Sequence, residues 1–454
     1  MKTSNFKLQT SVLNSQLTIG DWLLAISIAL LLAIAPASAQ QSTPHPIDLT
    51  SALKLAGAQN LDIKIARERL AEARANHASA LAQFFPWISP GITYRQHDDK
   101  IQDVQGNIID VNKSSYAPGA VLAAQVDIGD ALYKSLAAKQ LVKAAGHGLE
   151  AQRQDSVLAA AEGYFDLALA HASVGVARES LKIATDYEEQ IQRGVGAGIA
   201  FKGDELRVTV QRQRSQIALR QAMEQQRIAS ARLSQILHLE PTIELMPQDS
   251  ELVPLSLMDT NTALDSLVQR TLTSRPELKQ SQSLLAASRD AKSGAIYGPL
   301  IPSLGAQVFF GGLGGGRRGV ADTFGDQEDY FVGLSWRIGP GGLFDFTRTR
   351  ATESRMNEAG FILEKLRDDV TRQVVEAFTR WQSLADQLAT AKRMLGAAEQ
   401  ALRLAQQRKE FAVGVVLESI QAEQDLTHAR LDYLKTVADF NRAQYALKKA
   451  TGEL

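Results

Sequence analysis

Cysteine is absent from all 454 residues of the sequence. Its absence excludes disulfides, thiolate-ligated metal sites and a lipid-modified N-terminal cysteine, so we expect a protein that is not lipidated. Aromatic residues make up only 6%, and the 49 basic and 50 acidic side chains are nearly balanced. A balanced charge provides no basic surface for nucleic acid, and the abundance of Ala, Leu, Gln, Arg and Glu is typical of long paired helices.

Long apolar runs are also absent, apart from one near the N-terminus. The run "WLLAISIALLLAIA" at 22–35 follows a leader that contains Lys2 and Lys7, and the small residues "ASA" occupy 37–39. A spanning helix needs about 20 apolar residues, whereas a secretory signal has a shorter run between a basic start and small residues. We therefore predict an exported protein with a signal peptide over 1–39, and no membrane-spanning helix after it.

The remainder of the chain consists of two copies of one repeating unit. Residues 60–94 match 275–309 in pattern, 157–172 match 370–385, and 227–240 match 441–454. The offsets are all about 213 to 216 residues, and a fixed offset is the signature of an internal repeat. We predict a first repeat over 40–241, a linker over 242–261 that contains Pro247 and Pro254, and a second repeat over 262–454.

Both repeats show the same order of patterns: a helix, two strands, a very long helix and a second helix. Apolar residues at helical spacing cover 48–84, 130–193 and 204–238 in the first repeat, and 262–297, 342–409 and 416–451 in the second. A helix of about 64 residues is about 95 Å long. Such helices have no globular core of their own, so they must pack against neighbours as coiled coils.

The strand-like segments carry the most information about function. They cover 87–96 and 116–128 in the first repeat and 303–311 and 330–338 in the second, and apolar residues alternate with small or polar ones. Segments of about ten alternating residues are typical of transmembrane barrel strands, although hairpins of a soluble sheet alternate too. Strands in lipid must close into a barrel, and narrow barrels use about eight of them, so four spanning strands per chain require an oligomer.

No pattern of catalytic or cofactor-binding residues emerges. The stretch "GGGRRG" at 314–319 has a dinucleotide-type glycine spacing, but no helical pattern follows it. A flexible loop between two strands is therefore the better interpretation. The seven histidines form no zinc motif, and nucleophile-elbow and Walker motifs are absent. We expect neither an enzyme nor a resident cofactor or metal.

Four stretches carry a resemblance to a known family. They are "RPEL" (275–278), "LSWRIGPGGLFDFTRTRA" (334–351), "VGVVLESIQAEQDLTHARLDYL" (413–434) and "NRAQYALKKATG" (441–452). With the duplicated order of elements, the chain after residue 39 resembles the TolC-like outer-membrane efflux proteins over nearly its whole length. The resemblance implies a homotrimer with a 12-stranded barrel in outer-membrane lipid and a helical tunnel across the periplasm. It also implies a periplasmic adaptor protein and an inner-membrane transporter as partners.

The resemblance also assigns roles to the two glycine-containing breaks between long helices. In such proteins the helices turn back at a periplasmic tip that meets the adaptor, and the matching positions are Gly196, Gly198, Val413, Gly414 and Val415. Acidic side chains just beyond each turn face the closed pore, and these positions fall on Asp204 and Glu418. Alternatively, these acids only interact with the helix dipole, as acids in a first turn do. Three nearby arginines either link helices or are simply solvated: Arg193, Arg207 and Arg408.

These patterns and the resemblance together predict an α+β fold, in which long antiparallel coiled-coil helices form a tunnel and each chain adds four transmembrane strands. The expected function is a trimeric outer-membrane exit duct of a tripartite efflux pump or a type I secretion system. Such a duct passively conducts what the adaptor and transporter deliver. The alternative is a soluble periplasmic coiled-coil scaffold without transport activity, in which the strands form soluble hairpins.

Overall fold

The structure, a computed structural model, describes residues 45–454 except 241, 250, 260–262, 318–322 and 411–415. The predicted signal peptide over 1–39 lies outside these described residues. Among the helices of the described part, none is both long and apolar enough to cross a bilayer.

The first half of the chain contains four helices: α2 (Leu49–Gln59), α3 (Leu61–Ala82), α4 (Ile128–Gly196) and α5 (Lys202–Ile236). The predicted single helix over 48–84 is two helices, because Asn60 ends one and caps the next. The Asn60 side-chain oxygen accepts a hydrogen bond from the backbone nitrogen of Asp62 at 2.8 Å, and its amide donates to the carbonyl of Ile236 at 3.0 Å. Helix α4 has 69 residues and is therefore about 100 Å long.

The second half repeats this order with α6 (Leu264–Ser274), α7 (Pro276–Tyr297), α8 (Phe346–Glu410) and α9 (Val416–Thr451), and a short 3-10 turn, η1 (Gly298–Leu300), follows α7. The predicted helix over 262–297 is again divided. Proline disfavours helical conformation in the residue before it, and Arg275 before Pro276 is extended, with φ −63° and ψ 126°. The divided first helix is therefore a property of both halves, although different residues cause it.

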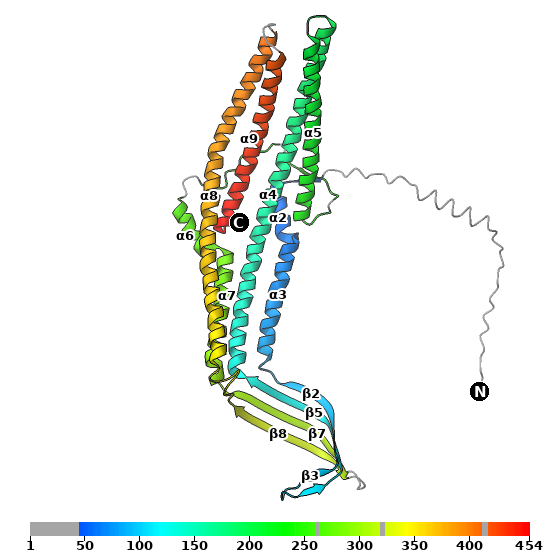
Figure 1. The fold of residues 1–454 in the computed structure, drawn as a ribbon, viewed down its shortest axis with the longest axis vertical. Coiled ribbons are helices and arrows are strands. Elements are labelled where there is room, and N and C mark those ends of the chain that lie inside the picture. The colour runs from blue at the N-terminus through cyan, green and yellow to red at the C-terminus, as the bar shows by residue number, and fades with distance from the viewer. Residues whose placement is uncertain (1–44, 241, 250, 260–262, 318–322, 411–415) are drawn as a thin grey trace, which may run out of the picture. The chain divides into compact units, whose positions relative to one another are not determined.

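Four strands form one antiparallel sheet in the order β2 (Trp87–His97), β5 (Lys113–Asp127), β7 (Ser303–Arg317) and β8 (Thr323–Ser335) (Figure 1). The strands predicted at 87–96 and 116–128 differ from β2 and β5 by one to three residues at their ends, and the two strands predicted in the second repeat differ by more. The strand predicted at 303–311 continues to Arg317, so "GGGR" of the predicted loop is strand. The strand predicted at 330–338 spans 323–335 instead. Backbone pairing such as Gly311 with Gln327 extends this hairpin, and ladder hydrogen bonds need no apolar side chains.

Two further strand pairs have no signal in the sequence patterns. The hairpin of β3 (Lys100–Gln102) and β4 (Ile108–Asp110) lies within the segment that joins β2 to β5. The strands β1 (His45–Ile47) and β6 (Leu245–Pro247) pair in parallel. Since β6 belongs to the predicted linker over 242–261, this part of the linker is ordered and holds the start of the described chain.

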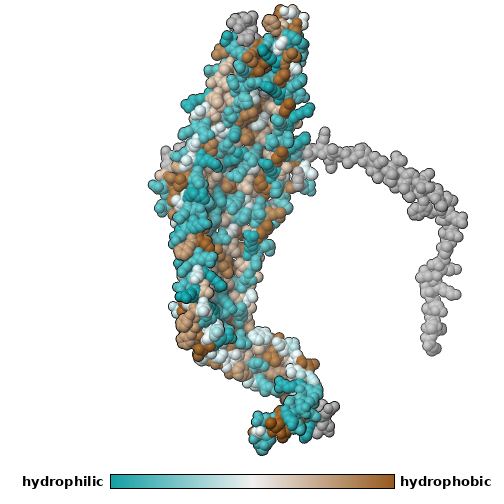
Figure 2. Space-filling model, in the orientation of Figure 1, coloured by the Kyte–Doolittle hydropathy of each residue, from teal (hydrophilic) through white to brown (hydrophobic). Residues whose placement is uncertain are grey.

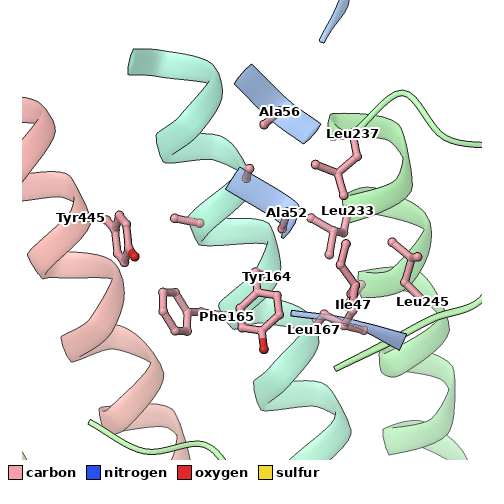
Figure 3. Close-up of a cluster of buried hydrophobic side chains, with 13 residues drawn as sticks. Ile47, Ala52, Ala56, Tyr164, Phe165, Leu167, Leu233, Leu237, Leu245 and Tyr445 are labelled. Carbon is pink, nitrogen blue, oxygen red and sulfur yellow. The ribbon is translucent and has the colours of Figure 1, made fainter. Parts of the chain in front are cut away.

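A buried core forms where α2, α4, α5 and β6 meet near the middle of α4 (Figure 3). Leu167, Leu233 and Leu237 are fully buried there, and Leu245 of the linker packs with them. The ring of Phe165 meets that of Tyr445 on α9 with 5.9 Å between centroids. The core therefore joins the two halves of the chain.

The linker is also held to α9 by two buried amide side chains. Asn441 accepts a hydrogen bond from the backbone nitrogen of Leu255 at 2.8 Å and donates to the carbonyl of Val253 at 2.9 Å. Gln444, one turn further on, makes the same pair of bonds with Leu257 and Leu255 at 2.7 and 2.9 Å. The two amides are 0% and 1% exposed, so they satisfy the linker backbone where water does not reach.

Replacing Asn441 by alanine should lower the free energy of unfolding by about 1–3 kcal/mol, because it leaves a backbone donor and a backbone acceptor without partners. The measurement is loss of helical circular dichroism against urea, on detergent-solubilised protein. Gln421→Ala, at an exposed position of α9, is the control and should change stability little. An Asn441→Ala variant as stable as the control would show that the linker is not held by this residue.

The main packing contacts arrange the elements in rows of four at three levels of the chain (Figure 1). The sheet has the order β2–β5–β7–β8. The helices next to it pack in the order α3–α4–α7–α8, and those toward the far end of α4 in the order α5–α4–α9–α8. The first and second halves of the chain thus lie side by side at every level. Within the described residues, the two ends of each row do not pack against each other.

Candidate functional site

One face of the sheet is mainly apolar, although Asp326 and Glu328 near the start of β8 also lie on it. The register places Ile88, Leu122, Val308 and Tyr330 in one line across the sheet. Residues paired in register share a face, and every second residue along a strand returns to it. The predicted alternating apolar residues that fall within the four strands therefore lie on the same face. Many of them are exposed in the chain, such as Ile92 at 77% and Val332 at 76%. Apolar residues are visible on the surface over the sheet in Figure 2.

The opposite face of the sheet carries side chains that are more polar and mostly smaller. It carries Ser89, Gln125, Gln307 and Ser335, among glycines and a few aromatic residues. Trp336 falls within the strand predicted at 330–338, but it lies beyond the end of β8. Its indole nitrogen donates a hydrogen bond to the carbonyl of Leu300 at 3.3 Å. The sheet thus separates an apolar surface from a more hydrophilic one.

At the far end of α4 the chain reverses through a turn centred on Gly198. The φ angle of Gly198 is +76°, which favours glycine, and the backbone nitrogens of Gly198 and Ile199 donate to the carbonyls of Val195 and Gly194 at 3.0 and 2.9 Å. This is the hydrogen-bond pattern of a Schellman C-cap. Gly196, in contrast, is the last residue of α4 and does not need a positive φ. The structure thus separates the two glycines that the sequence treats alike.

Two exposed apolar side chains follow this turn, and the sequence analysis did not single them out. Ile199 is 84% exposed and Phe201 is 82% exposed. The signal for them was an apolar pair inside the break itself, "GIAF" at 198–201. On the second break, Val413, Gly414 and Val415 lie outside the described residues.

The two predicted gate acids each take part in a separate ion pair. Asp204, in the first turn of α5, pairs with Arg207 at 3.1 Å, and its side chain is 23% exposed. Glu418, in the first turn of α9, pairs with Arg408 of α8 at 2.8 Å, and its side chain is 35% exposed. Arg408 therefore links two helices, whereas Arg207 stays within its own. Arg193 donates to the carbonyl of Glu189 at 3.3 Å on α4.

A small apolar cluster packs the α4/α5 pair of helices against α9 just behind these acids. It contains Ile191, Val208 and Ile420, with Tyr187 at its margin. Burial raises the pKa of the Tyr187 hydroxyl and the carboxylate of Asp204 adds to this, whereas a hydrogen bond with Ser419 opposes it. The cluster therefore joins the end of α4 to the start of α5 and of α9.

Within the described part of the chain, no cluster of three or more His, Asp or Glu residues has the arrangement of a metal site. The candidate functional features are instead two exposed surfaces. One is the apolar face of the sheet at one end of α4, and the other is the helix turn at its other end, which exposes apolar and charged side chains.

Comparisons with known proteins agree with this arrangement. The family model described as "Outer membrane efflux protein" matches residues 52–237 and 267–453. Protein CyaE of Bordetella pertussis is 24% identical over 324 residues, which are 70% of this chain and 66% of that protein, slightly under two thirds of its length.

Solved outer membrane channels share the fold. The CmeC channel of Campylobacter jejuni superposes with a TM-score of 0.73 at 15% identity, covering 89% of this chain and 85% of the channel. The open state of the MtrE channel of Neisseria gonorrhoeae superposes with a TM-score of 0.71 at 16% identity, covering 89% and 88%. The helix-rich fold with a small sheet is therefore that of outer membrane channels. Because the family model matches both halves and well over half of the residues, the chain belongs to the outer membrane efflux protein family.

Proposed function

We propose that the protein is a trimeric channel of the outer membrane, the exit duct of a tripartite efflux pump or of a type I secretion system. The observation that carries this proposal is the order of elements in rows. Each row has two different ends, β2 and β8 in the sheet, and these edge strands have unpaired backbone groups along one side. Joining one end to the other end of a second copy is a head-to-tail contact, which forms a closed ring when the rotation closes.

The number of copies follows from the sheet and the resemblance. One chain contributes a four-stranded sheet, and three copies give twelve strands, above the roughly eight that the narrowest barrels need. A closed ring with the apolar face outward places the exposed side chains of β2 and β8 in lipid. The polar face, with Gln125 and Gln307, then lines the lumen. Backbone groups in lipid must all be paired, which closure achieves.

The helical rows supply complementary evidence for the same ring. Helix α3, at one end of its row, exposes Leu61 and Ile65 at 48% and 50%. Helix α8, at the other end, exposes Phe361 and Ile362 at 69% and 53%. Contact between α3 of one copy and α8 of the next covers both apolar stripes. The helices then continue the barrel as a tube, which serves as a tunnel across the periplasm.

The turn after α4 is the surface we assign to the periplasmic adaptor. The exposed Ile199 and Phe201 provide an apolar contact, and Lys202, paired with Glu205 at 2.6 Å, adds charge beside it. Gly196 and Gly198, with Val413, Gly414 and Val415 of the second break, complete the proposed contact. Asp204 and Glu418 lie just behind the turns, where carboxylates from three copies form a gate that favours cations. The inner-membrane transporter supplies the cargo and the energy.

The experiment that tests the proposal measures mass and conductance of the same preparation. Protein extracted from outer membranes in detergent should have three times the mass of one processed chain, and should form pores in planar lipid bilayers. A water-soluble monomer from the periplasmic fraction, without conductance, would overturn the proposal and would favour the soluble scaffold.

A further inference from the structure

A buried carboxylate lies between the two long helix pairs, the α4/α5 pair and the α8/α9 pair. Glu423 on α9 is only 5% exposed. It is seven residues from the start of α9 and thus about 10 Å from the turn region. A carboxylate is costly to bury unless it is paired or hydrogen-bonded, so its surroundings have to explain its presence.

Both partners of Glu423 belong to the other helix pair. The Ser180 hydroxyl of α4 donates to one carboxylate oxygen at 2.7 Å, and the Gln211 amide of α5 lies 3.4 Å from the other. The next residue of α9 extends the connection, since the Gln424 amide donates to the Gln211 side-chain oxygen at 2.7 Å. These hydrogen bonds tie residues more than 200 positions apart in sequence. Glu423 is therefore at the centre of a polar joint between the two pairs.

No cation balances the charge of Glu423 among the described residues. Two basic residues that lie close along these helices pair with other acids: Arg212, next to Gln211 on α5, pairs with Glu188 at 2.6 Å, and Arg430 on α9 pairs with Glu179 at 2.8 Å. Burial raises the pKa of the Glu423 carboxyl, and the hydrogen bonds from Ser180 and Gln211 oppose this only in part.

A cavity of about 350 Å³ beside the joint contributes no positive charge either. From α4 its lining includes the titratable groups of Asp186 and Tyr187, and from α8 it includes the uncharged Leu402 and Gln406. Asp186 is acidic and Tyr187 is uncharged, so neither supplies a positive charge to Glu423. The residues from α5 and α9 other than Glu423, such as Gln211 and Ser419, are neutral.

The joint can accept a proton without losing its hydrogen bonds. The Ser180 hydroxyl lies 3.3 Å from that of Ser215, and either can donate to the other. When Glu423 is ionised, Ser180 donates to it. When Glu423 is protonated, its O–H donates to Ser180, which turns its own proton toward Ser215. A hydrogen bond between Glu423 and Ser180 is therefore available in both protonation states.

We propose that Glu423 is a proton-dependent joint between the α4/α5 pair and the α8/α9 pair, so that acid holds the pairs together and rising pH favours their separation. The effect on conductance rests on the proposed channel function, whereas the joint itself does not. The reason for the direction is linkage. In the joined state Glu423 holds its proton more tightly than the ordinary carboxyl, whose pKa is 4.5. Separation exposes it to water and releases the proton.

The pH window follows from the same argument. The extra stability of the joined state is fully present below the ordinary pKa of 4.5 and declines as pH rises through the raised pKa of the buried group. Above that pH, the joined state contains a buried negative charge, and its extra stability over the separated state is lost. The expected response is therefore separation at higher pH, the opposite of a joint held by an ion pair with a lowered carboxyl pKa.

The test measures the distance between the pairs and the conductance across a pH series. Because the sequence contains no cysteine, the double variant Gln192→Cys and Gln421→Cys places spin labels on exposed positions of α4 and α9. Labelled chain is diluted in unlabelled chain so that only distances within one copy are seen.

In this background we expect the distance to increase with pH. Adding Glu423→Gln, which is neutral at every pH, should keep the short distance throughout. Asp425→Asn, an exposed neighbour on α9, is the matched control and should retain the pH response.

A second variant, Ser180→Ala, tests the same proposal independently, in case Glu423→Gln does not fold. The net effect of the Ser180 hydroxyl is to lower the pKa of Glu423, so Ser180→Ala should move the transition to higher pH. An unchanged pH response in Glu423→Gln, or an unshifted one in Ser180→Ala, would overturn the joint. Loss of conductance at every pH with a retained pH-dependent distance would reject the channel and leave the joint standing. In a conducting protein, conductance should follow the distance.

Discussion

Replacing Val308 by arginine should abolish the assembled trimer, whereas replacing its neighbour Gln307 by arginine should preserve it. Val308 lies near the middle of β7, on the apolar face between Leu122 and Tyr330. Arginine on a lipid-facing strand at the bilayer midplane costs about 2–4 kcal/mol. A trimer contains three such positions, so the total is about 6–12 kcal/mol, comparable with the whole stability of many proteins.

Gln307 is a matched control because it precedes Val308 directly and points to the other face, between Ala123 and Phe331. The proposed barrel places that face in the water-filled lumen, where arginine costs little. The measurement is the trimer band of outer-membrane fractions on a gel without boiling, together with conductance of the extracted protein. Equal trimer yield from both variants would contradict the assignment of the two faces, and loss from Gln307→Arg alone would reverse it.

Replacing Ile199 and Phe201 together by aspartate should reduce export to the level of a strain without the protein, while the trimer remains normal. Both side chains are more than four-fifths exposed and follow the Gly198 turn, so the change removes little from the core. If they form the apolar contact with the adaptor, two carboxylates at that surface must be desolvated without partners on docking. The expected loss is therefore in docking and not in folding.

A control for this variant lies at the opposite end of the structure from the Gly198 turn. Val104 in the β3/β4 hairpin is also fully exposed, and Val104→Asp should leave both trimer and export unchanged. Export is measured as drug susceptibility or as secreted protein, and the adaptor contact as cross-linking in intact cells. Full export by the Ile199/Phe201 variant would remove the turn after α4 from the adaptor contact, and would direct attention to Val413, Gly414 and Val415.

The faces of the strands could be predicted from the sequence, but their ends could not. Alternation with a period of two is local, so the sequence alone separates residues such as Ile88 and Leu334 from their neighbours, and the register places both on the apolar face. The extension of β8 to Thr323 depends on pairing with β7, whose own glycines give no side-chain signal. The same holds for β1 and β6, which are each three residues long and gain their pairing only from tertiary contact.

The helix turns show a similar limit. The glycines of the first break indicated a turn, because a positive φ is the property that glycine supplies, but only the backbone shows that Gly198 and not Gly196 adopts it. Glu423 gave no signal at all, since an acid within a helix is usually solvated. Its burial depends on which helices pack around it, and that is set by the order of the rows. The assignments of Asp204 and Glu418 to a gate remain predictions.

The buried amides of Asn441 and Gln444, here called the amide clamp, bind the linker to α9 and provide a fixed point about which α9 can tilt. Asn441 lies 18 residues along α9 from Glu423 and 25 from Val416, distances of about 27 and 38 Å along a straight helix. A lever of that length multiplies angle into displacement. A tilt of about 5° at the clamp moves the start of α9 by about 3 Å, roughly the width of one hydrogen bond, and moves Glu423 by about 2 Å. In the proposed channel, a tilt this small is therefore enough to separate Glu423 from Ser180 while the linker stays bound to α9.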